Sequence, residues 1–244
     1  MILAIDAGNS RVKWGWYQRD DRGGGWSSIA TVSLIEFAAS SDHINPFSAT
    51  HENPSRIIIS NVAGEGAHQL LVNWTSIFEA EPLWLTGEAE RCGVTSRYQR
   101  PEQLGADRWA SLVAARGLHQ GACLVVNAGT ATTVDLLSEQ GEFLGGLILP
   151  GVDLMRFVLH EHTGRLPLQE GRFERTPRNT LDAIETGCRH AQAGAVERMY
   201  RVAGTQALCL VSGGAGLALI EQLGIPCRYV ENLVLEGLAR IAWS

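Results

Sequence analysis

The sequence lacks a long apolar run and carries no excess of positive charge. A helix that crosses a bilayer needs about 18 consecutive apolar residues, and no segment of this sequence reaches that length. The 20 Lys and Arg residues are outnumbered by 26 Asp and Glu residues, which gives a net charge of −6. Nonspecific binding to nucleic acid requires a cationic surface. We therefore expect a protein that binds neither membranes nor nucleic acid.

Cysteine is also scarce, and its placement excludes two kinds of site. The five cysteines form no C-x-x-C pair and have no histidine partner at zinc-binding spacing. Their odd number argues against a disulfide framework. The chain begins directly with the strand-like ILAID, without a basic leader and hydrophobic signal region. These features predict a cytoplasmic protein with free thiols.

The sequence contains one motif that occurs twice. LAIDAGNS at Leu3–Ser10 is echoed by LVVNAGTA at Leu124–Ala131, about half of the 244-residue chain later. Each copy is a buried strand that runs into a tight glycine turn. Glycine lets main-chain N–H groups approach a ligand closely. The repeat predicts two lobes, residues 1–117 and 118–244, with a triphosphate as the first ligand to consider.

The two halves also share an order of predicted elements. In the first half we expect a strand at Arg11–Tyr17, a loop through Asp20, Asp21 and Gly23–Gly25, a helix at Thr31–Ala39, a strand at Arg56–Ser60, a helix at Gly66–Phe78, a strand at Leu83–Thr86 and a helix at Pro101–Gly117. In the second half we expect strands at Cys123–Asn127, Thr132–Leu137 and Glu142–Ile148, helices at Val152–Leu159 and Thr180–Val202, a strand at Ala207–Ser212, and helices at Leu217–Leu223 and Leu233–Ala242. The polar segment Pro167–Arg178 is a predicted loop. Strands that end at Ser60 and Ser212 correspond, so duplication with an insertion explains the order. It implies two α/β lobes with mixed sheets.

The first turn offers groups that suit a phosphate and a metal ion. Asn9 and Ser10 supply donors to phosphate oxygens, and Lys13 supplies a positive charge. Asp6 could position Mg²⁺, which keeps several waters and takes few protein ligands. The alternative is an ordinary turn followed by a solvated lysine.

The second and third turns are neutral. Thr130, Thr132 and Thr133 follow the second glycine, and hydroxyl and backbone N–H groups can hold a phosphate without adding charge. The third turn, Ser212–Gly216, follows a buried strand and opens a helix, which suits a nucleotide's phosphate or sugar. Tight helix packing explains its glycines almost as well.

Six segments along the chain, by their order and spacing, resemble the motifs of a known family. They are DAGNSRVKWG near the start, GADR at Gly105–Arg108, NAGTATTVD at Asn127–Asp135, GGLILPG at Gly145–Gly151, NTLDAIETG at Asn179–Gly187 and SGGAG at Ser212–Gly216. The chain resembles the type III pantothenate kinases, in the superfamily of actin-like, sugar-kinase-like ATPases. The resemblance covers nearly the whole chain. It implies a duplicated ribonuclease H-like (actin-like ATPase) fold, with two lobes around a central ATP cleft.

The resemblance also implies an activity and a set of site residues. The activity is ATP-dependent phosphorylation of pantothenate to 4'-phosphopantothenate, the first step of coenzyme A biosynthesis, with Mg²⁺. The ATP phosphate loop would consist of Asp6, Ala7, Gly8, Asn9, Ser10, Arg11, Val12 and Lys13, and Thr130 would contact ATP. Pantothenate would be bound by Tyr98, Gly105, Ala106, Asp107 and Arg108, with Asp107 as catalytic base. Thr180 would reach pantothenate across the interface of a homodimer.

Chemistry supports the pair Asp107 and Arg108 independently. Phosphoryl transfer to a hydroxyl passes through a loose transition state, so the base mainly orients the alcohol and accepts its proton late. A carboxylate can do this, and a guanidinium fork matches the carboxylate of the substrate. The alternative is an exposed pair at a helix start, where an acid is favourable to the helix dipole.

One residue departs from the family pattern. Relatives often carry Asp at the position of Asn127, and that acid is associated with a monovalent cation, K⁺ or NH₄⁺. An amide is a neutral and weaker ligand, so we expect K⁺ to be dispensable or weakly bound.

Two other functions stay open on the sequence. One is a catalytically idle ATP-binding fold that acts as a regulator, although Asp6, Lys13, Asp107 and Arg108 argue against it. The other is a kinase or phosphohydrolase of the same superfamily that acts on another substrate.

Overall fold

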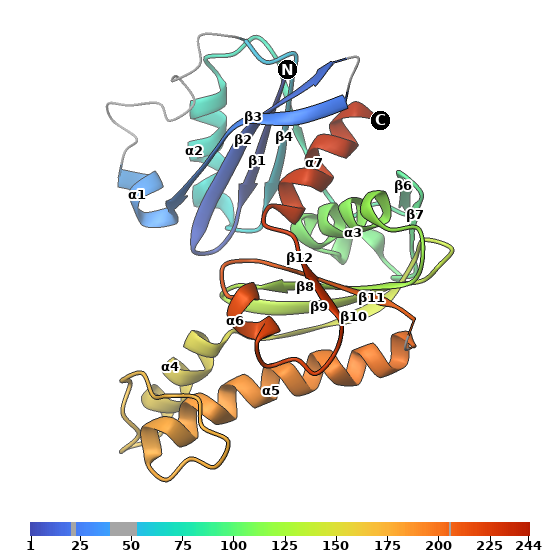
Figure 1. Cartoon of the computed structure of the whole chain (residues 1–244). Coiled ribbons are helices and arrows are strands. Elements are labelled where there is room, and N and C mark those ends of the chain that lie inside the picture. The colour runs from blue at the N-terminus through green and yellow to red at the C-terminus, as the bar shows by residue number, and fades with distance from the viewer. Residues whose placement is uncertain (21–22, 40–52, 205) are drawn as a thin grey trace. The chain divides into compact units, whose positions relative to one another are not determined.

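The computed structural model describes the chain apart from residues 21–22, 40–52 and 205. Its contacts divide it into two compact units (Figure 1). The first unit contains Met1–Leu118 and Leu233–Ser244, and the second contains His119–Asn232. The C-terminal helix α7 (Leu233–Trp243) thus belongs to the first compact unit. The separate roles predicted for residues 1–117 and 118–244 stay a prediction.

The first unit is built on a mixed sheet. Its strands lie in the order β3 (Gly23–Ser33), β2 (Arg11–Asp20), β1 (Ile2–Ala7), β4 (Arg56–Asn61) and β5 (Pro82–Trp84). The pairs β1–β2 and β2–β3 are antiparallel, whereas β1–β4 and β4–β5 are parallel. The central strand β1 is an almost continuous apolar run because both of its faces are covered.

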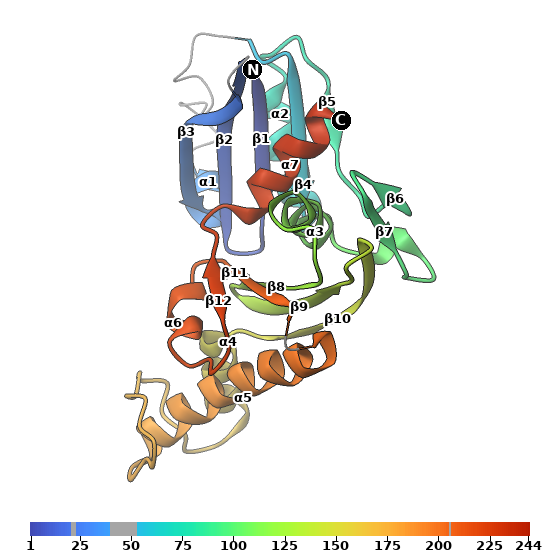
Figure 2. The ribbon, with the colours of Figure 1, turned by 45° about the vertical axis from the view of Figure 1, so that its right-hand side comes forward.

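Helices cover the two faces of this sheet (Figure 2). On one face lie α1 (Leu34–Ala39) and α2 (Glu65–Thr75), whose Phe37 and Trp74 pack with Trp14 and Trp16 of β2 in one core cluster. On the other face α7 contacts β1 and β4, and α3 (Ala106–Leu118) contacts β4. These two helices touch so closely that a Cβ atom at position 237 would collide with the carbonyl of Ala110, and the glycine there makes the contact possible. A small hairpin of β6 (Glu90–Arg91) and β7 (Val94–Ser96), and the 3-10 helix Pro101–Gln103, lead into α3.

The second unit repeats the sheet of the first. Its own strands lie in the order β10 (Glu142–Pro150), β9 (Ala131–Leu137), β8 (Cys123–Ala128), β11 (Leu208–Ser212) and β12 (Cys227–Tyr229). Their directions match those of β3, β2, β1, β4 and β5 pair by pair. The predicted duplicated α/β fold is therefore confirmed.

The insertion predicted for the second half is helical. Between β10 and β11 lie α4 (Val152–His162), a loop, and the 24-residue α5 (Thr180–Ala203). Helices α5 and α6 (Gly216–Ile220) pack on one face of this sheet (Figure 2). In the part of the chain that the structure describes, no helix is long and apolar enough to span a membrane.

Some predicted boundaries were wrong. The glycines 23–25 and residues 31–33 belong to β3, so the helix expected at Thr31–Ala39 begins only at Leu34. Glycine fits the strand at position 24 because the ring of Tyr17 on the neighbouring strand occupies the space that a Cβ atom would fill. The predicted loop residue Asp21 lies outside the described residues. The helix expected from Leu217 to Leu223 ends at Ile220, and β6, β7 and β12 were not predicted.

The helix expected from Pro101 is interrupted. A 3-10 turn spans Pro101–Gln103, Leu104 is extended, and α3 starts at Ala106. The break places Asp107 in the first turn of α3 rather than in its middle.

Candidate active site

The first glycine turn joins β1 to β2 at the end of the central strand. The N–H of Gly8 donates to the carbonyl of Arg11 at 2.9 Å, which closes the turn and leaves Asn9 and Ser10 exposed. The N–H of Leu34 donates to the Ser10 carbonyl at 2.9 Å and ties the turn to the end of β3. The turn is thus fixed while its polar tip stays open to a ligand.

Asp6 lies beside this turn, between two polar partners on neighbouring strands. Its register partners are Lys13 on β2 and Ser60 on β4. Its Oδ1 atom is buried and accepts a hydrogen bond from no described residue. Burial, and to a smaller extent repulsion by Asp107, raise the pKa of Asp6 from 3.8 to about 7. Ser60 and Lys13 oppose this rise. A cation bound next to Asp6 would therefore strongly stabilise its ionised carboxylate.

Asp107 occupies the first turn of α3, where the helix dipole favours an acid. Its Oδ1 atom accepts the backbone N–H of Arg108 at 2.8 Å. A Cβ atom at Gly105 would lie 2.6 Å from this Oδ1, so glycine leaves the carboxylate its room. Burial raises the pKa of Asp107, while the N–H and the charge of Arg108 lower it. The structure brings Asp6 and Asp107 together as a repelling carboxylate pair.

Arg108 and Tyr98 lie next to each other. Arg108 is only 4% exposed, and its Nη1 donates to the Tyr98 hydroxyl at 3.4 Å. The guanidinium carbon lies 6.0 Å from the centre of the Tyr98 ring. Arg108 is therefore a buried and oriented cation, not the solvated residue of an exposed helix start. This burial favours a binding role.

The second turn has the same frame with one residue fewer. In the first turn Asp6 pairs with Lys13, and in the second Asn127 pairs with Thr133. Thr133 therefore stands where the first unit has its lysine, and the positive charge is lost. The N–H of Gly129 donates to the Ala131 carbonyl at 3.0 Å.

The three threonines of this turn differ in access. Thr130 is exposed, as an ATP contact requires, whereas Thr132 is 0% and Thr133 is 8% exposed. The Thr132 hydroxyl accepts a hydrogen bond from Gln192 at 2.8 Å. Thr130 is thus the hydroxyl of this turn that is open to solvent.

The third turn is fixed by the second. Gly213 has φ of 95°, and a Cβ atom there would collide with the carbonyl of Ala128. The same carbonyl accepts the N–H of Ala215 at 3.0 Å. The glycine at 213 is thus required by close packing against the end of β8, and a nucleotide-binding role for this turn stays a prediction.

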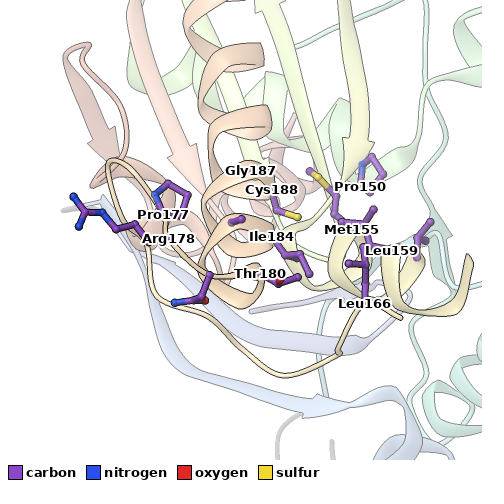
Figure 3. Close-up of a pocket in the computed structure, with 13 residues that line it drawn as sticks. Pro150, Met155, Leu159, Leu166, Pro177, Arg178, Thr180, Ile184, Gly187 and Cys188 are labelled. Atoms are coloured by element: carbon purple, nitrogen blue, oxygen red, sulfur yellow. The ribbon is translucent and has the colours of Figure 1, made fainter. Parts of the chain in front are cut away.

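Thr180 begins α5 and lines a pocket of about 960 Å³ in the second unit (Figure 3). The lining is mostly apolar, with Met155 and Leu159 from α4 facing Ile184 from α5. The polar side chains of the lining include Asn179, whose Oδ1 caps α5 by accepting the N–H of Asp182 at 2.9 Å.

Sequence reasoning missed two residues of the site. Ser60, near the end of β4, was noted as part of the repeat but not as the strand neighbour of Asp6. The other is Gln192, which no motif contains. Ser60 had a usable signal, because both of the corresponding predicted strands end in serine, whereas Gln192 had none.

These features define the class of the protein. Two units with one strand order, each with a glycine turn after its central strand, form the duplicated actin-like ATPase fold. Among solved structures, a putative Baf family transcriptional activator from Campylobacter jejuni matches with a TM-score of 0.64 at 21% identity, covering 99% of this chain and 97% of its own. A putative 2-dehydro-3-deoxygalactonokinase from Sinorhizobium meliloti matches at 0.61 and 16%, covering 99% and 98%. These likenesses concern the fold alone.

Sequence comparison gives the family. The family model described as type III pantothenate kinase matches residues 2–202. Proteins named type III pantothenate kinase are 51% identical in Aromatoleum aromaticum, covering 99% of this chain and 98% of the relative, and 45% identical in Nitrosospira multiformis, covering 99% and 91%. The chain belongs to the type III pantothenate kinase family, the phosphotransferases that phosphorylate pantothenate with ATP in coenzyme A biosynthesis. The predicted family and activity are confirmed.

Proposed function

We propose that this chain transfers the γ-phosphoryl group of ATP to the primary hydroxyl of pantothenate, with Asp107 as the base. The observation that carries this assignment is the placement of Asp107 beside Asp6, in room left by Gly105. The turn from Asp6 to Lys13 would hold ATP phosphates, and Thr130 would contact the nucleotide from the second unit.

The environment of Asp107 suits a base that acts late in the reaction. Its Oδ1 accepts the Arg108 N–H, so the carboxylate is oriented before the alcohol arrives. Burial raises its pKa, which strengthens it as a proton acceptor. In a loose transition state the alcohol keeps its proton until late, so this modest basicity is sufficient.

The residues around Asp6 fit Mg²⁺. A cation would pair with the buried Asp6 oxygen, which has no hydrogen-bond partner among the described residues, and would stabilise the charged form of this carboxylate, whose pKa is raised. Among the described residues no group of three or more His, Cys, Asp or Glu side chains could hold a metal. This agrees with an ion that keeps its waters and uses one or two carboxylates and the phosphates. When bound, the ion would neutralise charge on the phosphates, while Asp6 would fix its position.

Pantothenate carries a carboxylate, and Arg108 is the cation we assign to it. The guanidinium is held against Tyr98, so little side-chain entropy is left to lose on binding. Tyr98, Gly105 and Ala106 would complete this part of the substrate site.

We also propose a homodimer in which Thr180 of one protomer serves the substrate site of its partner. Thr180 is exposed on the second unit. Helix α4, which lines the same pocket, exposes Phe157 at 48% and Val158 at 43%, and such neighbouring apolar side chains favour an interface. Light scattering on the purified protein should give twice the chain mass of 26.5 kDa. A monomer at micromolar concentration would contradict the dimer without touching the kinase assignment.

The substitution Asp107→Asn tests the catalytic role. The amide keeps an acceptor for the Arg108 N–H but cannot take a proton, so kcat should fall by roughly 10²–10⁴ with little change in the KM for pantothenate. Glu65→Gln is the matched control, because Glu65 is an exposed carboxylate in the first turn of α2. Its kcat should equal that of wild type. Wild-type turnover by Asp107→Asn would remove Asp107 from the role of base.

A further inference from the structure

Gln192 is a buried amide that none of the sequence motifs contains. It lies on α5 and is only 3% exposed. Its Nε2 donates to the hydroxyl of Thr132 at 2.8 Å and to the carbonyl of Pro150 at 3.2 Å. One side chain therefore joins three segments, namely α5, the start of β9 and the end of β10.

Each acceptor is close to Thr130, the exposed residue of the second glycine turn, one along the chain and the other through a neighbouring hydrogen bond. Thr132 follows Thr130 by two residues along the chain. Pro150 precedes Gly151, whose N–H donates to the Thr130 carbonyl at 2.8 Å. Gln192 thus holds β9, which follows Thr130 along the chain, to the end of β10, whose next residue Gly151 donates to Thr130.

In the first unit, the corresponding glycine turn is held by a backbone hydrogen bond and apolar packing. There the N–H of Leu34 holds the Ser10 carbonyl, as Gly151 holds that of Thr130. The residue in the register position of Thr132 is Val12, which is fully buried and packs in the apolar core cluster of that unit. Both units therefore share the backbone contact, but the second has a hydrogen-bonded pair where the first has an apolar packing residue.

Burying such a pair is costly unless both partners are satisfied. A buried donor or acceptor left unpaired costs roughly 1–3 kcal/mol, so an apolar residue such as valine is the simpler filling. The pair also adds direction, because a hydrogen bond fixes an angle and a distance that packing alone leaves looser.

We propose that Gln192 is a positioning residue for ATP, which acts through Thr132 and Pro150 to hold Thr130 in the conformation that contacts the nucleotide. This inference rests on the proposed function, in which the second turn binds ATP. It predicts a defect in ATP binding and none in pantothenate binding.

The test uses Gln192→Met, which keeps the length of the side chain and removes the donor. The KM for ATP, and the Kd of a non-hydrolysable ATP analogue, should rise about tenfold, because both hydrogen bonds that position the turn are lost. The KM for pantothenate and kcat should stay within about twofold of wild type, because binding that is equal in ground and transition states changes only KM.

Thr186→Val is the matched control on the same helix. Thr186 is 4% exposed and its hydroxyl exchanges hydrogen bonds with the backbone of Glu174, at 3.0 and 3.2 Å, away from the second turn. This variant should lower the melting temperature about as much as Gln192→Met and leave the KM for ATP unchanged. A merely structural role of Gln192 predicts the same result for both variants.

A second variant covers a failure of Gln192→Met to fold. Thr132→Val removes one acceptor, keeps the shape, and copies the residue type of Val12; it should raise the KM for ATP severalfold. If the wild type phosphorylates pantothenate and these variants keep its KM for ATP, the role of Gln192 is refuted alone. If the wild type shows no pantothenate-dependent turnover, the proposed function itself fails.

Discussion

The substitution Asp6→Asn should make the metal-free protein more stable at pH 8 while it abolishes turnover. In the folded chain, burial and repulsion by Asp107 raise the pKa of Asp6 from 3.8 to about 7. The folded protein therefore holds the Asp6 proton more tightly than the unfolded chain. Stability is lost as pH rises from about 4 to about 7, since the unfolded chain has already released its proton there.

The magnitude follows from this shift. About three pKa units correspond to about 4 kcal/mol at 1.36 kcal/mol per unit. Because the Asp6 residue is only partly buried, we expect about half, roughly 2 kcal/mol, above pH 7. For a chain of this size that is a rise in melting temperature of about 4–8 °C. At pH 4 the native carboxyl is protonated and the gain should vanish.

The assay is thermal unfolding of wild type and Asp6→Asn in EDTA at pH 4.5 and 8. Asp182→Asn is a control of opposite sign, because the backbone N–H of Arg172 and the side chain of Asn179 lower the pKa of Asp182. That variant should lose stability at pH 8. A gain for Asp6→Asn that is the same at both values of pH, or a loss at pH 8, would refute the electrostatic account of Asp6.

Three further outcomes follow from the site. Gly105→Ala places a Cβ atom 2.6 Å from the Asp107 Oδ1, so steady-state kinetics should show kcat reduced by about 10²-fold in a protein with normal circular dichroism. Arg108→Lys replaces a buried fork by a single ammonium, and the KM for pantothenate should rise about tenfold while that for ATP stays constant; equal increases would contradict the assignment. Replacing K⁺ by tetramethylammonium should leave turnover nearly unchanged, because Asn127 offers only an amide, and a large loss would show that K⁺ is required.

Much of the fold could be predicted because the periodic signals were strong. The apolar strands before each glycine turn and the long α5 have patterns that tertiary packing reinforced. The errors occurred where packing overrode local preference. At Gly24 the Tyr17 ring fills the place of a side chain, and at Pro101 a helix-start signal produced a 3-10 turn.

The candidate site was predictable only where residues with the required chemistry lie close together along the chain. Asp6 and Lys13 lie close along the chain and form a register pair. Ser60 reaches Asp6 through parallel strand pairing, and Gln192 reaches Thr132 across 60 residues. Such partners are set by topology, which no local pattern contains. The pKa of Asp6 likewise depends on Asp107, a residue on another element.

The central claim is that Asp107 and the first glycine turn serve phosphoryl transfer to pantothenate. The most direct measurement is ADP release by the purified wild-type chain with ATP and Mg²⁺, with and without pantothenate. The account predicts ADP, together with an equal amount of 4'-phosphopantothenate, only when pantothenate is present. Equal ADP release in its absence, or none in its presence, would contradict it.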